Sequence, residues 1–261
     1  MAEMIIATES LSYWVGQQQI LDNVSLQVPR GAIYGFLGSN GAGKTTTIKI
    51  LLSLLKVPSE NVFLFGKELW ANRRSILQRV GSLVEQPAIY GHLTGRENLA
   101  NRALLLQIPH ERIDRVLMLV GLAEAGNKKA GHYSLGMKQR LGIALALLHD
   151  PELLILDEPT NGLDPRGMME LRELLHRLSA EEGKTVFISS HLLGEIEKIA
   201  THVGIIHQGK LLFQGSVGEL YRTGGIPGFV HLSVGQGGTA VRATWGPGPG
   251  AYITPTHPGH R

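Results

Sequence analysis

The chain has 261 residues, of which 43% are hydrophobic and 18% charged, enough for one large domain or two small ones with a substantial core. Its 25 basic residues exceed the 22 acidic ones by too little to indicate a nucleic-acid partner, and the lack of cysteine excludes disulfides and thiolate metal sites. No stretch approaches the roughly 18 consecutive apolar residues of a membrane span, so we expect any action at a membrane to require a partner.

The first half of the chain changes its pattern twice. Apolar and polar residues alternate over the first thirty residues, most clearly at 20–28, which predicts antiparallel strands with one solvent-facing side. A short apolar strand at 32–37 then runs into glycine-rich sequence, and a helix is predicted at 45–55, before Pro58.

The stretch from about 87 to 150 has helical patterns without a convincing strand, and we interpret it as a helical insertion. Its predicted helices lie at 94–106, 111–120 and 135–149. Strands and helices alternate again after it, which predicts a parallel sheet; the elements are a strand at 153–157, a helix at 165–180, a strand at 185–190 and a helix at 192–200.

The composition shifts at Thr223. Ten glycines and five prolines occur in the 39 residues from Thr223 to Arg261, a density typical of a flexible tail. We therefore expect one domain over residues 1–222 and a flexible Gly/Pro-rich tail over 223–261.

A glycine-rich motif joins the strand at 32–37 to the helix that follows. It reads Gly38-Ser39-Asn40-Gly41-Ala42-Gly43-Lys44-Thr45 and fits the phosphate-binding pattern G-x-x-x-x-G-K-[ST] in full. Small residues let backbone N–H groups turn toward phosphate oxygens, and the helix N-terminus adds its positive dipole end. We expect Lys44 to reach the β- and γ-phosphates, Thr45 to bind Mg²⁺ and Thr46 to lie near the α-phosphate. The motif alone does not distinguish kinases, GTPases and transport ATPases.

Two carboxylates follow the apolar strand at 153–157. We expect Asp157 to hold Mg²⁺ and Glu158 to polarise the attacking water as a general base. Asp164 and Pro165 fit an N-cap and first helical residue, so the intervening turn also has a purely structural interpretation. His191 follows the next predicted strand, 33 residues after Glu158, which makes it a second candidate catalytic residue.

The segment His132-Tyr133-Ser134-Leu135-Gly136-Met137-Lys138-Gln139-Arg140 precedes a long helix. A serine N-cap would account for it structurally. It also resembles the Leu-Ser-Gly-Gly-Gln signature of ABC ATPases, with Ser134 and Gly136 matching while Leu135 and Met137 replace a glycine and the glutamine. The variant looks like the subgroup that exports drugs and confers immunity to bacitracin and lantibiotics, and the resemblance extends over about residues 4–222.

The resemblance implies an α/β fold: a P-loop NTPase core with an N-terminal antiparallel β-subdomain and an inserted helical subdomain. It implies ATP and Mg²⁺ as cofactors. Ser134 and Gly136 would contact the γ-phosphate of ATP held by a second ATPase subunit, in a homodimer or a paired head-to-tail dimer, and His191 would contact the γ-phosphate as a switch histidine.

Two family positions stay open. The glutamine of the family's Q-loop falls on Glu85 with Gln86 beside it, and either could bind Mg²⁺. The aromatic residue that stacks on adenine would fall at Val15, whereas this chain has Tyr13 and Trp14; Tyr13 is our candidate, although both aromatics could simply pack in the sheet.

The resemblance thus implies an ATP-hydrolysing motor subunit, peripheral at the cytoplasmic face of the membrane, that drives a separate integral-membrane permease. The Q-loop region and the helical subdomain would meet short coupling helices of that permease. One alternative is a soluble ABC ATPase acting on ribosomes or DNA, which a single ATPase unit without sustained heptads disfavours. Another is a regulatory ATP-binding module, which the presence of both Lys44 and Glu158 disfavours. The transported substrate stays open, because the permease would select it.

Overall fold

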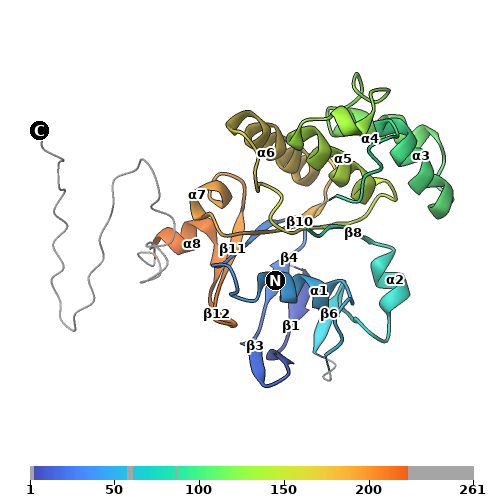
Figure 1. The fold of residues 1–261 in the computed structure, drawn as a ribbon. Coiled ribbons are helices and arrows are strands. Elements are labelled where there is room, and N and C mark those ends of the chain that lie inside the picture. The colour runs from blue at the N-terminus through green and yellow to red at the C-terminus, as the bar shows by residue number, and fades with distance from the viewer. Residues whose placement is uncertain (1–2, 58–60, 86, 223–261) are drawn as a thin grey trace, which may run out of the picture.

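The computed structural model describes residues 3–57, 61–85 and 87–222 (Figure 1). The predicted flexible tail, residues 223–261, lies outside the described residues.

A six-stranded sheet forms the centre of the molecule, in the order β12-β11-β5-β10-β9-β8. The five strands from β11 to β8 are parallel, as the alternation of strands and helices predicted, and β12 pairs antiparallel with β11. The strands are β5 (Ile33–Leu37), β8 (Val80–Leu83), β9 (Leu153–Leu156), β10 (Thr185–Ser190), β11 (His202–His207) and β12 (Lys210–Ser216).

The antiparallel strands predicted near the N-terminus are confirmed. Of these, β2 and β3 form a separate hairpin, while β1 and β4 join β6 and β7, which were not predicted, in a small sheet of the order β4-β1-β6-β7. The strands are β1 (Met4–Thr8), β2 (Leu11–Val15), β3 (Gln18–Val24), β4 (Gln27–Pro29), β6 (Val62–Leu64) and β7 (Lys67–Glu68).

Helices fill the stretch predicted to be a helical insertion, and no strand is assigned between residues 87 and 150 in the described structure. The helices within the described residues are α1 (Lys44–Leu51), α2 (Arg73–Leu77), α3 (Gly95–Leu106), α4 (Glu111–Leu119), α5 (Leu135–Leu147), α6 (Pro165–Ala180), α7 (Leu193–Ile196) and α8 (Val217–Arg222), with a 3₁₀ turn at Ala130–His132. None of the described helices combines the length and the apolar character needed to span a bilayer.

The predicted helix boundaries were wrong in three places. The α1 and α5 helices end at Leu51 and Leu147, earlier than predicted, and α7 covers only Leu193–Ile196 of the helix predicted at 192–200. No side chain caps α7 in the described structure, and Gly194 lies in its first turn, where its backbone freedom weakens a helix.

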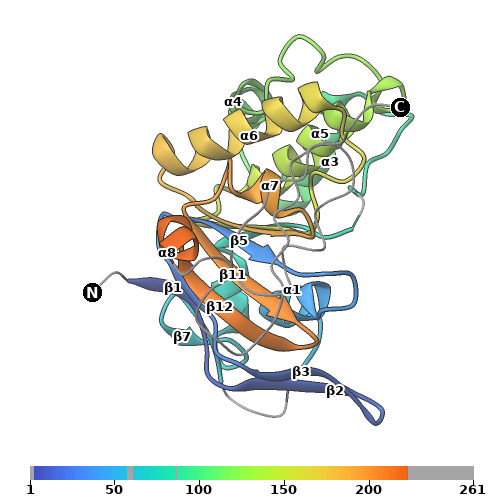
Figure 2. The same ribbon diagram turned by 90° about the vertical axis from the view of Figure 1, so that its left-hand side faces the viewer.

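Helices and the small sheet cover the two faces of the central sheet, which buries the apolar side chains that its strands present on both sides. In β9, Leu154 and Leu156 face the core shared with α3–α6, while Leu153 and Ile155 face the core shared with α1 and the small sheet. Figures 1 and 2 show this arrangement, with α3–α6 on one side of the sheet and α1, β1 and the β2–β3 hairpin on the other. Continuous burial of this kind is typical of parallel strands.

An ionic junction ties the helical region to the core where α5 ends. Asp150 Oδ1 lies 2.7 Å from Arg112 Nη2 on α4 and 2.8 Å from Lys184 Nζ, just before β10. The Arg112 guanidinium also donates to the last carbonyls of α5, at Leu147 and Leu148. Cations at a helix C-terminus satisfy its free carbonyls and interact favourably with its dipole.

Candidate nucleotide-binding site

The candidate site residues meet because they follow neighbouring parallel strands. The strands β5, β10, β9 and β8 are consecutive in the sheet. The last residues of β5 and β10 pair, Leu37 with Ser190, and so do those of β8 and β9, Leu83 with Leu156; β10 extends two residues beyond Ile188, the partner of Leu156. Ligand sites in open parallel sheets form beyond the carboxyl ends of the strands. Here that edge carries the glycine-rich loop, His191, the Asp157–Glu158 pair and Glu85.

The glycine-rich loop has a backbone that only glycine adopts readily. Gly41 and Gly43 have φ values of 80° and 110°, in the left-handed region. A Cβ atom on Gly43 would lie 2.6 Å from Leu21 Cδ2, and one on Gly38 would lie 2.6 Å from the Ile206 carbonyl oxygen. In the described structure no side chain caps α1, whose N-terminus follows Gly43, so its first N–H groups are available to an anion. The loop therefore has the shape and polarity of a phosphate cradle.

Lys44 is buried at the start of α1, and its ammonium group faces the loop. Its Nζ donates to the carbonyl oxygens of Gly38, at 2.7 Å, and Ser39, at 3.2 Å. It also lies 3.0 Å from Glu158 Oε1. The cation predicted to bind phosphate is thus held against the loop and shares an ion pair with the predicted general base.

Asp157 is held by two hydroxyl groups from different elements. Thr45 Oγ1 donates to Asp157 Oδ2 at 2.9 Å, and Ser189 Oγ donates to Asp157 Oδ1 at 2.6 Å. Ser189 also accepts a hydrogen bond of 2.8 Å from the backbone N–H of Glu158. Ser189 was not among the predicted site residues; the available signal was a polar residue at the end of an otherwise apolar strand.

Glu158 lies between two partners, one for each carboxylate oxygen. Oε1 faces Lys44, and Oε2 lies 2.8 Å from His191 Nδ1. The backbone of Glu158 has a φ of 48°, in the left-handed region that side chains other than glycine rarely adopt. The two candidate catalytic residues therefore contact each other directly, in a local geometry that strand packing has to maintain.

The oxygen atoms beside Lys44 fit a hard divalent cation. The Thr45 hydroxyl and the Asp157 carboxylate lie in contact, and Asp157 is only 6% exposed. No ammonium or guanidinium pairs with Asp157 in the described structure. Mg²⁺ is usually bound by one or two protein oxygens together with phosphates and water, and the described residues contain no larger group of acidic or histidine ligands. These two protein oxygens therefore suit a Mg²⁺ site in which a bound nucleotide would supply further oxygen ligands.

Ser134 and Gly136 lie at the N-terminus of α5. Ser134 is its N-cap and accepts a hydrogen bond of 3.2 Å from the Met137 N–H, as predicted for a capping serine. Its side chain is exposed and makes no hydrogen bond to the phosphate loop in the described part of the chain. A Cβ atom on Gly136 would approach its nearest neighbour, Gly167 Cα, no closer than 3.7 Å. This helix end is therefore accessible to a group from outside the chain.

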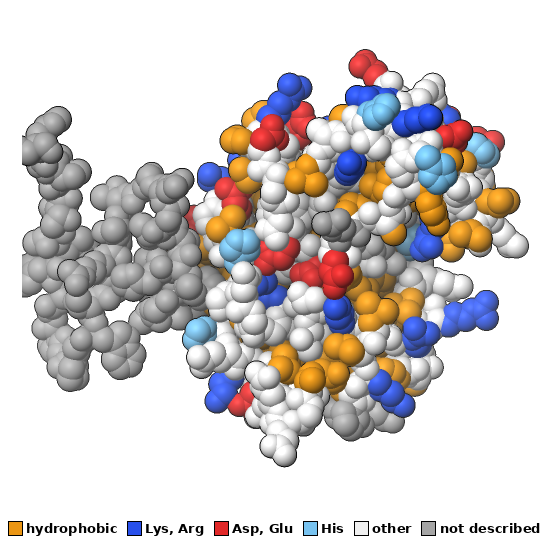
Figure 3. Space-filling view, viewed as in Figure 1, with side chains coloured by type: hydrophobic (Ala, Val, Ile, Leu, Met, Phe, Trp, Pro, Cys, Tyr) orange, Lys and Arg blue, Asp and Glu red, His pale blue; other side chains and the backbone are white. Residues whose placement is uncertain are grey.

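A cavity of about 710 Å³ separates the carboxylates from the helical region. Asp157, Glu158 and Asn161 line it on the core side, and Leu135, Lys138 and Gln139 of α5 line it on the other. In the face of the molecule that Figure 3 shows, acidic side chains gather near the middle. The general-base candidate is thus reachable from this space.

The remaining predicted site residues make no direct contact with the carboxylates within the described structure. Glu85 lines the same cavity, but its carboxylate is paired with Lys49 at 3.0 Å, and Gln86 lies outside the described residues. Tyr13 is half-buried and packs against the core that also contains Leu21, whereas Trp14 is 51% exposed. The Q-loop ligand and the adenine contact therefore stay predictions.

Comparison with known proteins identifies the family. Residues 21–161 match the model of the ABC transporter family. The chain is 55% identical over 209 residues to the bacitracin transport ATP-binding protein BcrA of Bacillus licheniformis, covering 80% of this chain and 68% of that protein. It is 40% identical over 210 residues to the lantibiotic transport ATP-binding protein SrtF of Streptococcus pyogenes, covering 80% of this chain and 90% of that protein.

Solved structures agree with the sequence comparisons. The structure of cbiO1 from Clostridium perfringens, described as part of the ABC transporter complex cbiONQ, superposes with a TM-score of 0.78 at 27% identity and covers 84% of this chain and 91% of that one. The fold agrees with that of this relative. The chain belongs to the ABC transporter family and is its ATP-binding, ATP-hydrolysing subunit.

Proposed function

We propose that this subunit powers the export of a peptide antibiotic of the bacitracin or lantibiotic type through a separate integral-membrane permease. The observation that carries the proposal is the 55% identity to a bacitracin transport ATP-binding protein over 209 residues, a length that spans most of the described domain. The similarity to a lantibiotic transport ATP-binding protein supports the same substrate class.

In this proposal, each candidate residue has a defined task in ATP hydrolysis. Lys44 and the loop N–H groups would bind the β- and γ-phosphates, and Thr46 would lie near the α-phosphate. Thr45 and Asp157, whose side chains are hydrogen-bonded, would hold Mg²⁺, which would neutralise phosphate charge. Glu158 accepts a proton from the attacking water, and the His191 contact at 2.8 Å orients its carboxylate. Glu85 and Gln86 remain the two candidates for a further ligand to the ion.

A dimer completes the site in the same proposal. The exposed serine and the free helix N-terminus at Ser134 and Gly136 suit an anion, and they make no hydrogen bond to the phosphate loop of their own chain within the described residues. A second ATPase subunit packed head to tail would present them to the γ-phosphate. ATP would then hold two subunits together, and hydrolysis would release them.

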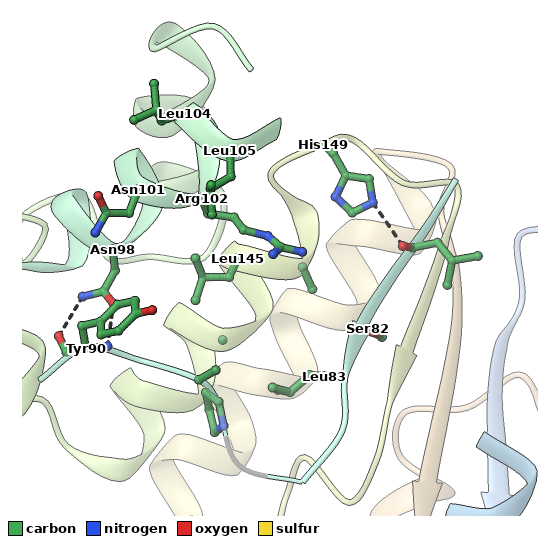
Figure 4. A pocket seen from close by; sticks show the side chains of 15 residues that line it. Ser82, Leu83, Tyr90, Asn98, Asn101, Arg102, Leu104, Leu105, Leu145 and His149 are labelled. Atoms are coloured by element: carbon green, nitrogen blue, oxygen red, sulfur yellow. Dashed lines mark hydrogen bonds between the residues drawn. The ribbon is translucent and has the colours of Figure 1, made fainter. Parts of the chain in front are cut away.

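The permease is expected to dock on a groove between α3 and α5. The groove has a volume of about 500 Å³, and Tyr90, Leu104, Leu105 and Leu145 are among its lining residues (Figure 4). Its floor includes Ser82 and Leu83 of β8, the strand that leads to Glu85. A partner seated there would contact both the helical region and the segment that ends beside the carboxylates, at the cytoplasmic face of the membrane.

Co-purification tests the proposed function. The tagged chain is recovered from detergent-solubilised membranes of its own host, and the proteins that accompany it are identified by mass spectrometry. A stoichiometric polytopic membrane protein is expected, and loss of that permease should increase sensitivity to the exported peptide. Recovery of ribosomes or nucleic acid without a membrane protein would overturn the proposal in favour of a soluble ATPase.

A further inference from the structure

The groove between α3 and α5 combines exposed leucines with an arginine. Leu104 and Leu105 are 79% and 77% exposed, so two successive large apolar side chains face solvent, a feature that can mark an interaction site. Figure 3 shows hydrophobic side chains gathered on the side of the molecule where α3 lies. Among the residues that line the groove, Arg102 and His149 carry the ionisable nitrogen groups, and none is an aspartate or glutamate.

Arg102 differs from the other arginines of the helical region. The sequence has five arginines between residues 95 and 147, and in the described structure all except Arg102 pair with a carboxylate. The four pairs are Arg96–Asp114, Arg112–Asp150, Arg115–Glu182 and Arg140–Glu170. Figure 4 shows the Arg102 side chain extending between Leu105 and Leu145 toward His149, so its guanidinium group lies inside the groove.

His149 adds no positive charge to the groove at neutral pH. Its Nε2 lies 3.1 Å from the Val80 carbonyl oxygen, which can only accept, so the ring proton is on Nε2. Its Nδ1 is buried and makes no hydrogen bond within the described structure. Burial lowers the pKa of His149, and the nearby Arg102 charge lowers it further, against the opposing effect of the Val80 contact. Among the lining residues, the charge of this groove is therefore that of Arg102 alone.

Resting on the proposed function, we infer that the groove recognises a short permease segment with apolar side chains and one Asp or Glu. The apolar residues of that segment pack on Leu104 and Leu105, and its carboxylate pairs with the Arg102 guanidinium group. An arginine can hold a carboxylate through two parallel hydrogen bonds, which fixes orientation as well as position. Apolar contact supplies affinity, and the single ion pair sets which permease fits and in which register.

The test compares two substitutions of Arg102 in the full chain with a matched control. Arg102→Glu reverses the charge, Arg102→Lys keeps it, and Arg74→Glu makes the same reversal at an exposed arginine on α2, across the central sheet from the groove. Each tagged chain is expressed in its host and recovered from solubilised membranes, and the co-purifying permease is quantified against the tagged chain. We expect Arg102→Glu to lower the recovered permease by about tenfold or more, with Arg74→Glu at the parental level.

Two further readouts separate recognition from folding. Basal ATPase activity of the isolated Arg102→Glu chain should stay at the parental level, because Arg102 is outside the catalytic machinery. In the Arg102→Lys complex, a carbodiimide should join the introduced amine to a permease carboxylate, and mass spectrometry of the cross-linked peptide identifies that residue. Capture of the permease by Arg102→Glu at the parental level, or an intact Arg102→Lys complex with no such cross-link, would overturn the inference. Failure of the parental chain to capture any permease would instead refute the proposed function.

Discussion

Ser189 offers the sharpest test of how the carboxylates are positioned. Its hydroxyl lies on β10, fully buried, and joins the two acidic residues by donating to Asp157 Oδ1 at 2.6 Å and accepting from the Glu158 N–H at 2.8 Å. In Ser189→Ala both hydrogen bonds are lost, while the backbone of β10 keeps its pairing with β5 and β9. The substitution thus removes a positioning contact without touching either carboxylate.

The expected effects follow from the two contacts. A hydrogen bond to a charged group contributes about 1.5–3 kcal/mol, and an unsatisfied buried N–H costs about 1–3 kcal/mol. Since the Glu158 segment can relax toward the adjacent cavity, we expect the free energy of unfolding to fall by about 2–4 kcal/mol. Small displacements of reacting groups reduce rates strongly, so we expect kcat for ATP hydrolysis to fall by about 10- to 100-fold.

Phosphate release at saturating ATP measures kcat, and urea unfolding measures stability. The matched control is Ser190→Ala, at the neighbouring buried serine, whose hydroxyl accepts a hydrogen bond of 3.0 Å from the Leu192 N–H. The free energy of unfolding of the control should fall by about 1 kcal/mol, and its kcat should stay within about twofold of the parental value. If Ser189→Ala is folded and hydrolyses ATP at the parental rate, Ser189 does not position the carboxylates and the reasoning is refuted.

Three further predictions concern charged groups. In Lys44→Ala, ATP binding measured by calorimetry should weaken by about tenfold or more, since a buried charge-assisted contact contributes about 1.5–3 kcal/mol; parental affinity would contradict the role of Lys44. In Glu158→Gln, turnover should fall by about 10²–10⁴-fold while ATP-dependent dimers accumulate in light scattering, and a parental rate would show that Glu158 is not the base. The hydrogen bond from Arg79 lowers the pKa of Glu152 to about 2, so its carboxylate stabilises the fold above about pH 4.5 and this contribution is lost as the pH falls toward 2. Because Glu152 is 42% exposed, Glu152→Gln should lower the free energy of unfolding by only about 1 kcal/mol at pH 7. The urea-unfolding midpoint of the variant should also fall less than that of the parental chain as the pH is lowered, and an unchanged pH profile would argue against the pair.

The parts of the site that the sequence predicted are those determined locally. The phosphate loop needs glycines at fixed offsets because its φ values are positive, and a strand ending just before Asp157 and Glu158 places both carboxylates at the sheet edge whatever the rest of the fold does. The capping roles of Ser134 and Asp164 are equally local, since each accepts from an N–H three residues ahead.

The contacts between distant segments could not be predicted in this way. The Glu158–His191 contact and the two hydrogen bonds of Ser189 depend on the register of β9 against β10, which places Leu156 opposite Ile188. The pairing of Lys44 with Glu158 likewise joins residues that lie 114 positions apart in the sequence. Patterns along one chain report which face of a strand is buried, but not which side chains meet across its end.

Helix ends and departures from family patterns were the features that the sequence predicted least well. The helix predicted at 192–200 contracts to Leu193–Ile196, where Ile196 packs against Gly35 of β5 so closely that a Cβ atom there would clash. At Tyr13, residue type alone could not separate a base-stacking side chain from one that packs in the sheet, and the observed packing against the core explains why an aromatic residue is suited to that position.

The ion pair between Lys44 and Glu158 has a thermodynamic consequence for any measured affinity. With a phosphate bound at Lys44 as proposed, nucleotide and Glu158 Oε1 compete for one ammonium group, which lies 3.0 Å from that oxygen. Part of the intrinsic binding free energy is then consumed in separating the pair, so the apparent dissociation constant exceeds the intrinsic one. Neutralising Glu158 removes this competition. A dissociation constant obtained from a hydrolysis-deficient glutamine variant would consequently overstate how tightly the parental subunit holds ATP, and a transport cycle calculated with that constant would place nucleotide release too late.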